Sequence, residues 1–450
     1  MTATGVNVAT ASVPWRRGLA WLLFLGPFFF LSYGFANHVA AEREVSDTLL
    51  FEWERGIPFI PWTIIPYWSI DLFYGLSFLL CRDRQQVDRH ALRLLTVQIV
   101  SVICFLLFPL HFSFERPAVG GFFGAMFDAL MGFDKPYNQA PSLHIGLLVI
   151  IWARFAAGTP RSYSWLVHAW TVLIALSVLT TYQHHFIDIP TGALVGFLCL
   201  WLWPDSGRSP LTDWLPARVS ERGHLAIRYG LGALAAALVG IWLGGGGLWL
   251  LWLAAALGLV ALIYAVPGAK GFQKEHGRHS AASIALLAPY LVGAWINSRL
   301  WTLRRPQPDM IADGVWLGRM PTSRDMQHGG YRCLVDLTAE MPAPSGNWQY
   351  FCIPWLDLVA PEPEHLAEAA QRIEQARHHG PVLVCCALGY SRSASAVAAW
   401  LLLTGRTPSV EAAESLLRSR RSGIVFGPAH RRVLAELASQ AGLYAGGGHA

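Results

Sequence analysis

A cysteine and an arginine bracket a short loop near the end of the chain. The loop has the sequence CALGYSR and runs from Cys386 to Arg392, with Ser393 directly after it. A cysteine thiolate can attack phosphorus, and the planar guanidinium group of an arginine can hold two phosphate oxygens at once. The spacing therefore predicts a phosphate-binding loop with Cys386 as the nucleophile and Arg392 as the phosphate ligand.

The segments on both sides of the loop favour this interpretation. Residues 382–384 predict a buried strand, and residues 393–401 predict a helix. The loop would then lie at a helix N-terminus, where main-chain N–H groups and the helix dipole stabilise an anion. The alternative is a buried structural cysteine beside a surface arginine. Gly389 within the loop and Ser393 after it make that alternative weaker.

An acid for the same reaction lies upstream. Asp357 follows an apolar segment and precedes Pro361 and a predicted helix over 364–378. A carboxylic acid on a mobile loop can protonate the leaving oxygen while the thiolate attacks phosphorus. The alternative is that Asp357 is an ordinary loop carboxylate. The predicted mechanism needs side chains alone, so we expect no cofactor.

Residues 309–443 resemble the dual-specificity branch of the cysteine-dependent protein tyrosine phosphatases, on the motif just described. The resemblance implies an α/β fold with a central sheet flanked by helices. It also implies that Ser393 helps to release the thiolate and that Asp357 is the general acid. We further expect the loop residues Gly389 and Ser391 to help to bind substrate. One position departs from the family pattern: Cys385 stands where a histidine usually precedes the nucleophile.

The rest of the chain has the composition of a membrane protein. Of all residues, 54% are hydrophobic and 14% are charged, and the apolar residues form long blocks. We predict a polytopic helical domain of eight or nine helices, with no cleavable signal peptide at the first. The candidate spans are residues 18–35, 62–80, 94–112, 142–153, 165–182, 187–203, 225–243, 248–266 and 281–296.

Basic loops predict the orientation. Arginines flank most spans on one side, which places the N-terminus in the cytoplasm. The ninth segment has basic residues on both sides and contains Pro289, so it is predicted to be re-entrant or interfacial. The C-terminal domain is then cytoplasmic, which agrees with a catalytic thiol in a reducing compartment. The polar, basic loop over 268–280 is interpreted as a plain orientation signal, with contact to anionic lipid as the alternative.

A second group of polar residues lies on the opposite side of the predicted membrane. Ser142 and His144 open the fourth span, His184 and Asp188 lie four residues apart at the start of the sixth, and Arg116 follows the third. A carboxylate can orient one imidazole, which then attacks phosphorus while the second imidazole protonates the leaving alcohol. Metal binding is a weaker alternative because the ligand spacing is not tight.

His185 is adjacent to this group, and we expect it to be an interfacial anchor.

These residues resemble the type 2 phosphatidic acid phosphatase superfamily, over residues 62–203. The resemblance implies that Arg116 and Ser142 bind phosphate, His144 is the general acid, His184 becomes the phosphohistidine and Asp188 orients it. Three positions depart from the family motifs.

These positions are Pro109, Leu143 and Val178, where the family usually has lysine, glycine and arginine. The resulting motifs, Pro-Ser-Leu-His and a His-x3-Asp without the arginine, look closer to those of the inositol phosphorylceramide and sphingomyelin synthase branch. Head-group transfer is therefore an alternative to hydrolysis, and a lipid-sensing scaffold without catalysis is another.

The whole chain resembles bacterial inner-membrane fusions of a lipid phosphatase domain with a dual-specificity phosphatase domain. The predicted organisation is a membrane domain over 1–210, further helices and a linker over 211–304, the phosphatase over 305–445 and a disordered tail over 446–450. The predicted role is a membrane phosphatase in phospholipid metabolism that acts on phosphorylated lipids, with phosphoproteins as the alternative for the cysteine site. The net charge of +5 and the absence of a nucleic-acid motif argue against a nucleic-acid partner.

Overall fold

The computed structural model describes residues 14–43, 45–210, 212 and 221–442. The chain divides into two compact units, Met1–Thr212 and Asp213–Ala450. The predicted tail over 446–450 lies outside the described residues.

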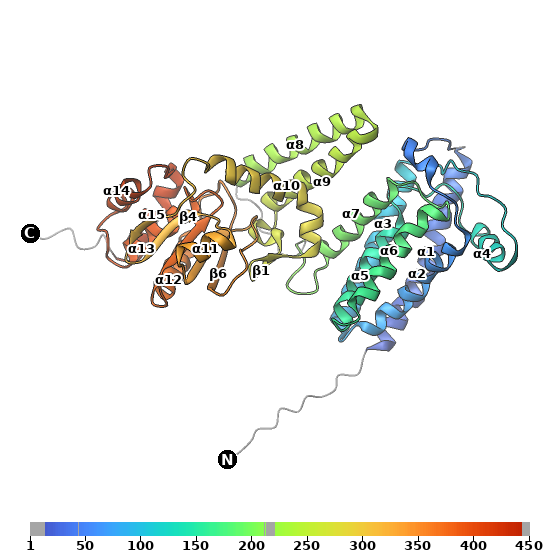
Figure 1. Cartoon of the computed structure of the whole chain (residues 1–450), viewed down its shortest axis with the longest axis horizontal. Coiled ribbons are helices and arrows are strands. Elements are labelled where there is room, and N and C mark those ends of the chain that lie inside the picture. Colours follow the sequence, from blue (N-terminus) through green and yellow to red (C-terminus); the bar gives the residue numbers. More distant parts are fainter. Residues whose placement is uncertain (1–13, 44, 211, 213–220, 443–450) are drawn as a thin grey trace, which may run out of the picture. The chain divides into compact units, whose positions relative to one another are not determined.

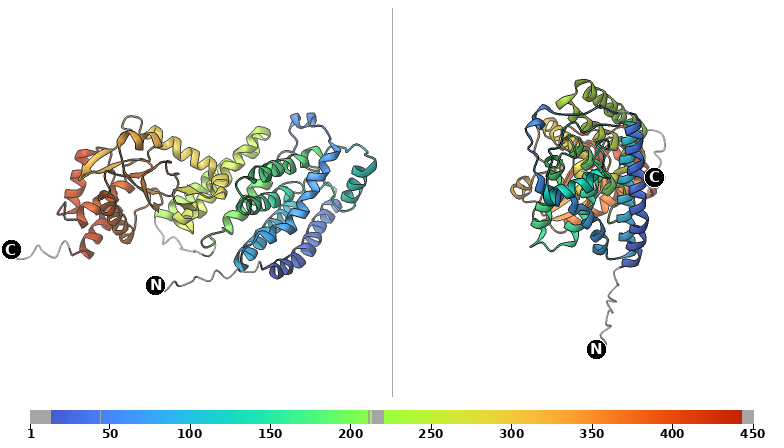
Figure 2. Two further views of the ribbon diagram at one scale, coloured as in Figure 1. Left: turned by 60° about the horizontal axis from the view of Figure 1, so that its bottom comes forward. Right: turned by 90° about the vertical axis from the view of Figure 1, so that its right-hand side faces the viewer.

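The N-terminal unit is a bundle of helices. Figure 2 shows several of them running side by side, and α1 packs on α3 while α5 packs on α7. The helices are α1 (Trp15–Glu42), α2 (Ile64–Ser77), α3 (Arg84–Leu107), α4 (Gly121–Met131), α5 (Leu143–Gly158), α6 (Ser164–Thr180) and α7 (Asp188–Leu202) (Figure 1). Three short 3₁₀ helices, Glu52–Gly56, Pro61–Thr63 and Phe78–Leu80, connect them. Helix α4 was not predicted from the sequence.

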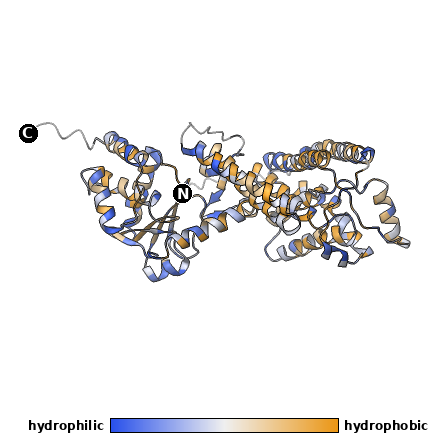
Figure 3. Ribbon diagram, turned by 90° about the horizontal axis from the view of Figure 1, so that it is seen from above, coloured by the Kyte–Doolittle hydropathy of each residue, from blue (hydrophilic) through white to orange (hydrophobic). Residues whose placement is uncertain are grey.

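Six helical segments are long and apolar enough to cross a membrane, judged by length and composition among the described residues. They correspond to predicted spans one to three and seven to nine. The predicted fourth, fifth and sixth spans form the shorter apolar helices α5, α6 and α7. Figure 3 shows the apolar character of these helices in orange, against the bluer outer helices of the α/β domain.

The C-terminal unit begins with three apolar helices. These are α8 (Glu221–Leu243), α9 (Leu250–Ala265) and α10 (Ala281–Trp301), and α9 packs on both of the others. Helix α10 continues unbroken through Pro289, so the helix itself is not interrupted there as a re-entrant segment would be. Short 3₁₀ helices, Gly245–Trp249 and Gly268–Phe272, join these helices, and a small hairpin of β1 (Lys274–Glu275) and β2 (Arg278–His279) follows the second.

An α/β domain completes this unit. Its five strands are β3 (Asp309–Ala312), β4 (Val315–Arg319), β5 (Cys333–Thr338), β6 (Gln349–Trp355) and β7 (Val382–Cys386). The strand order is β3-β4-β7-β5-β6, with β3 antiparallel to β4 and the other neighbours parallel. The helices are α11 (Ser323–Gly329), α12 (Pro363–Arg377), α13 (Arg392–Leu403), α14 (Val410–Arg420) and α15 (Pro428–Gln440).

Alternation along the central strand separates two cores. Val382 and Val384 pack with α12, α13 and α15 on one face of the sheet, whereas Leu383 and Cys385 pack with Met326 of α11 on the other. Strand side chains point to opposite faces with a period of two, so buried strands need apolar residues at every position. Strand β7 therefore lies in the middle of the sheet and delivers its last residue, Cys386, to the carboxyl edge.

Candidate active sites

The predicted phosphate-binding loop connects β7 to α13. The Sγ atom of Cys386 is buried, and it accepts hydrogen bonds from the main-chain N–H of Gly389 at 3.2 Å and from the hydroxyl of Ser393 at 3.3 Å. Both donors stabilise a thiolate, since charge-assisted hydrogen bonds are stronger than neutral ones. Helix α13 begins at Arg392, so its first N–H groups face the loop.

Gly389 is required by the path of this loop. Its φ of 76° lies in the left-handed region, and a Cβ atom there would be 2.4 Å from the carbonyl carbon of Gly318 on β4. Any side chain would have to displace main-chain atoms of the neighbouring strand. Glycine therefore allows the N–H of residue 389 to point at the cysteine sulfur.

Arg392 is buried and held by two carboxylates. Its guanidinium group donates to both oxygens of Glu340, at 2.6 and 2.9 Å, and to the carbonyl oxygen of Trp355 at 3.0 Å. One oxygen of Asp357 lies 3.0 Å from the same group. Burial lowers the pKa of Arg392, but Asp357 and Glu340 outweigh burial and raise it well above its ordinary value. The arginine is therefore a fixed positive charge at the base of the loop.

Asp357 lies in the loop between β6 and α12, next to the arginine. Burial is the main cause that raises the pKa of Asp357, and the Glu340 carboxylate raises it further, while Arg392 opposes both. The pKa of Glu340 itself is lowered, because Arg392 outweighs its burial. Glu340 is thus kept ionised, whereas Asp357 is more easily protonated. This division suits Glu340 as a support and Asp357 as an acid.

Two further residues near the nucleophile make their contacts elsewhere. The hydroxyl group of Ser391 lies 3.1 Å from Nε2 of His430 on α15. Cys385 belongs to the opposite face of the sheet, and burial raises its pKa well above the ordinary thiol value. Cys385 is therefore a structural thiol at the position where the resembled family usually has histidine.

Comparisons with known proteins agree with this geometry. The family model described as "Dual specificity phosphatase, catalytic domain" matches residues 315–440. This segment is a dual-specificity phosphatase catalytic domain. The earlier resemblance is confirmed for the C-terminal part of the chain, and cysteine-based phosphoester hydrolysis is supported with it.

Solved structures are also similar to a part of this chain. Tk-PTP in the active form is 27% identical, PTPMT1 is 22% identical and human DUSP28 is 22% identical. They cover 30%, 31% and 29% of this chain and 99%, 98% and 96% of their own, with TM-scores of 0.28, 0.28 and 0.27. None of the curated proteins compared with the chain matches it.

The apolar helices of the C-terminal unit contact the loops of this phosphatase domain. The hydroxyl of Tyr264 on α9 donates to the carbonyl oxygen of Asp357 at 3.1 Å, and that of Ser298 on α10 donates to the carbonyl oxygen of Ala387 at 2.6 Å. The ammonium group of Lys274 is buried and donates to Asp336 at 2.6 Å. The interpretation of 268–280 as a plain orientation signal was thus incomplete, because Lys274 is a buried structural charge.

The second predicted group comes together in the N-terminal unit. Ser142 is the N-cap of α5, and its hydroxyl lies 3.1 Å from Nε2 of His184. Nδ1 of His184 lies 3.1 Å from Asp188, the first residue of α7. Close packing of α5 on α7 makes this possible, since a Cβ atom on Gly192 would be 2.4 Å from the carbonyl oxygen of Ser142. The carboxylate fixes one ring nitrogen and leaves the other facing Ser142.

His144 and Arg116 lie near this chain of contacts. The ring of His144 stacks on Tyr67, with centroids 4.2 Å apart, and lines the same cavity as His184. The guanidinium group of Arg116 donates to the carbonyl oxygens of Thr181 and Tyr182. The structure thus brings four of the predicted residues together, namely Ser142, His144, His184 and Asp188. Arg116 is held near them by hydrogen bonds to main-chain oxygens.

The prediction for His185 was wrong. This residue is buried, with its ring 3.3 Å from a carboxylate oxygen of Glu54 and 3.1 Å from the hydroxyl of Ser113. Glu54 also accepts a hydrogen bond from the main-chain N–H of Phe186. His185 therefore ties the segment before α7 to the segment after α1, and its buried ring is not exposed to act as an interfacial anchor.

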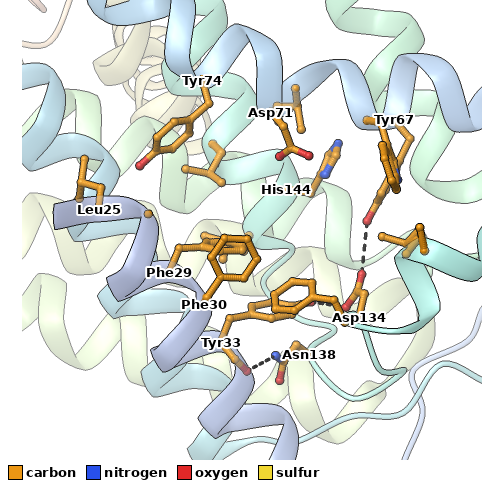
Figure 4. A pocket seen from close by; sticks show the side chains of 18 of the residues that line it. Leu25, Phe29, Phe30, Tyr33, Tyr67, Asp71, Tyr74, Asp134, Asn138 and His144 are labelled. Atoms are coloured by element: carbon orange, nitrogen blue, oxygen red, sulfur yellow. Dashed lines mark hydrogen bonds between the residues drawn. The ribbon is translucent and has the colours of Figure 1, made fainter. Parts of the chain in front are cut away.

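Sequence reasoning also missed the carboxylate of Asp134. It follows α4 and accepts a hydrogen bond from the hydroxyl of Tyr33 at 2.6 Å, while the hydroxyl of Tyr67 lies 3.5 Å away (Figure 4). No spacing marks it, because its partners come from α1 and α2. Among the described residues, no cluster of three or more histidine, cysteine, aspartate or glutamate side chains is arranged to hold a metal ion.

Proposed function

We propose that this protein is a membrane-bound phosphoric ester hydrolase whose cysteine site removes phosphate from lipid phosphomonoesters. The observation that carries the proposal is the contact of apolar helices with both catalytic loops, through Tyr264 to Asp357 and through Ser298 to Ala387. A site supported by helices long enough to cross a bilayer lies where lipid head groups are concentrated, which raises their effective concentration. We place this domain in the cytoplasm and the chain in a bacterial inner membrane.

The reaction at this site follows from the geometry. The Cys386 thiolate attacks phosphorus and forms an S–P bond while the bond from phosphorus to the leaving oxygen breaks. Asp357 gives its proton to that oxygen, and Arg392 and the loop N–H groups hold the other phosphate oxygens. Water then attacks phosphorus and gives a proton to Asp357, while the S–P bond breaks. Ser393 donates a hydrogen bond to the departing thiolate. Inorganic phosphate and the free thiolate result.

A second phosphoryl-transfer site in the N-terminal unit is supported by the contacts from Ser142 through His184 to Asp188. We propose that His184 attacks a lipid phosphate and that His144 protonates the leaving group, as the resemblance to the type 2 phosphatidic acid phosphatases implies. In the alternative, head-group transfer, His184 attacks a phosphodiester, the lipid alcohol leaves with a proton from His144, and the phosphoryl group passes with its head group from His184 to another alcohol.

The test uses the purified full chain in detergent. Phosphate release is measured from a short-chain lipid phosphomonoester and from a phosphotyrosine peptide, for the wild type, Cys386→Ser, His184→Ala and the control Cys352→Ser. We expect Cys386→Ser to abolish release from the lipid and Cys352→Ser to retain it. Faster release from the peptide than from the lipid would contradict the lipid assignment.

The His184→Ala variant tests the second site separately. Loss of one lipid activity while the cysteine activity remains supports catalysis in the N-terminal unit. If every lipid activity survives this change, the unit is a scaffold and the histidine mechanism is wrong.

A further inference from the structure

Buried arginines gather at the end of the N-terminal unit away from the histidines. Arg93 lies in α3 and is 1% exposed, and Arg154 lies near the end of α5 and is 6% exposed. Helices α3, α5 and α7 pack on one another (Figure 1). At a rise of about 1.5 Å per residue, Arg154 lies roughly 18 Å along α5 from Ser142. The arginines are therefore separate from the histidine site.

One carboxylate pairs with both arginines. Nη2 of Arg154 lies 2.7 Å and Nη2 of Arg93 lies 3.0 Å from the same oxygen, Oδ1 of Asp205. No other carboxylate of the described residues forms an ion pair with either guanidinium group. The side chain of Asp205 is 55% exposed. Because a guanidinium group stays protonated in proteins, the two arginines keep one positive charge that Asp205 does not neutralise.

Arg89 adds to this charge, from one turn before Arg93 in α3. Its guanidinium group donates to the main-chain carbonyl oxygens of Asp205 and Gly207. The C-termini of α5 and α7 lie at this end of the bundle, and each carries a partial negative charge of roughly half a unit. Three arginines against one carboxylate and two helix ends still leave the group positive.

Two buried N–H donors of these arginines are unpaired. Nη1 of Arg93 and Nε of Arg154 are buried and have no hydrogen-bond partner in the described part of the chain. The remaining nitrogens have partners: Nε of Arg93 donates to the carbonyl oxygen of Trp203 at 2.8 Å, and Nη1 of Arg154 donates to Oε1 of Gln86 at 3.3 Å. A buried donor without an acceptor is costly, and native proteins usually satisfy it with water or an ion. Excess positive charge at the same place favours an anion.

The chemistry of the group selects a phosphate. Guanidinium groups bind phosphate oxygens through parallel N–H donors, and two of them that meet from different helices can share one tetrahedral anion. Helix α3 is long and apolar enough to cross a membrane, and Arg89 and Arg93 lie in its first half. Basic pockets between the ends of such helices are typical sites for lipid head groups.

We propose that Arg93 and Arg154 bind a phosphate group, carried by a lipid head group or present as free phosphate. The bound group would join α3, α5 and the segment after α7. No bond is made or broken there, so the site goes beyond the proposed function and is independent of both catalytic proposals.

The thiol of Cys81 provides a local reporter. Cys81 is buried, follows the 3₁₀ helix after α2 and interacts electrostatically with Arg154 and Arg93. Its reaction with N-ethylmaleimide requires that this end of the bundle open. A ligand that binds only the closed form makes opening rarer by the factor 1 + [L]/Kd. The catalytic sites do not enter this readout.

The test labels the purified full chain in a maltoside detergent and measures each cysteine by mass spectrometry of its peptide. Inorganic phosphate or dihexanoylphosphatidylglycerol is compared with chloride at equal ionic strength. We expect labelling of Cys81 to slow at least about fivefold at saturation. Labelling of Cys333, in the other unit, should not change. Equal Cys81 rates in phosphate, lipid and chloride would overturn the proposal.

The two probes identify the source of the phosphate group. Protection by the lipid at concentrations at least about tenfold lower than those of free phosphate supports a head-group site. Protection by free phosphate at the lower concentration supports a site for the ion. Either result supports the proposed ligand chemistry.

Variants locate the site. Arg154→Gln should lose the protection, whereas Arg161→Gln, at an exposed position after α5, should keep it. Asp205→Asn removes the competing carboxylate, so half-protection should require at least about threefold less anion. A merely structural role of the arginines would instead speed labelling of Asp205→Asn at every anion concentration. Protection that persists in Arg154→Gln would refute the assignment, and the wild-type comparison decides the case if this variant does not fold.

Discussion

The hydroxyl group of Tyr264 donates a hydrogen bond to the main-chain carbonyl oxygen of Asp357, at 3.1 Å. The ring of Tyr264 also packs against Tyr229 of α8, with ring centroids 5.3 Å apart, and Tyr229 packs against Tyr290 of α10 with centroids 5.8 Å apart. Each of the three apolar helices therefore contributes one tyrosine to a packed cluster, which contacts the general-acid loop through Tyr264. The position of the acid depends on how these helices pack.

Replacement of Tyr264 by phenylalanine tests this dependence. Loss of one hydrogen bond of about 1 kcal/mol should slow hydrolysis of an alkyl phosphomonoester about fivefold, because the leaving oxygen needs a placed proton. Hydrolysis of p-nitrophenyl phosphate should change little, because its leaving group needs less protonation. Initial rates on both substrates measure the difference.

A structural role alone would slow both substrates equally. Adding Tyr264→Phe to Asp357→Asn should have no further effect on the alkyl substrate, since the acid is already absent. The exposed Tyr163 provides the matched control as Tyr163→Phe.

The raised pKa of Asp357 gives a pH prediction. A general acid acts when protonated, so a pKa raised by burial and by Glu340 extends activity on alkyl phosphates toward higher pH. The rate should fall as pH rises through this pKa, and Asp357→Asn should remove that limb together with most of the activity. A profile of kcat/KM against pH that keeps the same high-pH limb in Asp357→Asn would show that another group is the acid.

Much of the cysteine site could be predicted from the sequence because its parts are close together along the chain. The loop from Cys386 to Arg392 needs only a strand before it and a helix after it, and both follow from local apolar patterns. Glu340 escaped prediction because its partner Arg392 is 52 positions away. That contact depends on the parallel pairing of β5 with β7, which no local pattern encodes.

The N-terminal site shows a similar limit. The histidines and Asp188 lie in short motifs, whereas Asp134, Tyr33 and Tyr67 meet only because helices far apart in the chain pack together. The buried position of His185 depends likewise on Glu54, 131 residues away. The role of 268–280 was missed because a lysine in a polar loop is normally solvated, and only tertiary packing buries Lys274.

Replacement of Glu340 by glutamine should change two properties. The Glu340 carboxylate raises the pKa of Asp357, so its removal should move the high-pH limb of kcat/KM to lower pH. The buried guanidinium group of Arg392 also loses a charged partner, which should lower the melting temperature. The exposed Glu436 gives the control Glu436→Gln. An unshifted limb in a folded Glu340→Gln variant would contradict the proposed coupling.

The hairpin of β1 and β2 supports the same site from outside the phosphatase domain. The ammonium group of Lys274 donates to Asp336 and to the carbonyl oxygen of Thr338, and the ring of His279 lies 2.9 Å from the carbonyl oxygen of Ala339. These contacts fix the segment that leads directly into Glu340. The hairpin therefore helps to position Glu340, the carboxylate that pairs with Arg392.

Lys274→Met should destabilise the C-terminal unit, because it leaves the Asp336 carboxylate buried without its cation. Breaking a buried ion pair in this way costs about 3–5 kcal/mol, which corresponds to a fall in melting temperature of roughly 10 °C. Arg278→Met, at an exposed position of the same hairpin, should change it little. Adding Asp336→Asn should recover part of the loss, because the uncompensated charge is then removed. If Lys274→Met melts like the wild type, the hairpin does not support Glu340, and the loop after β5 is held by the sheet alone.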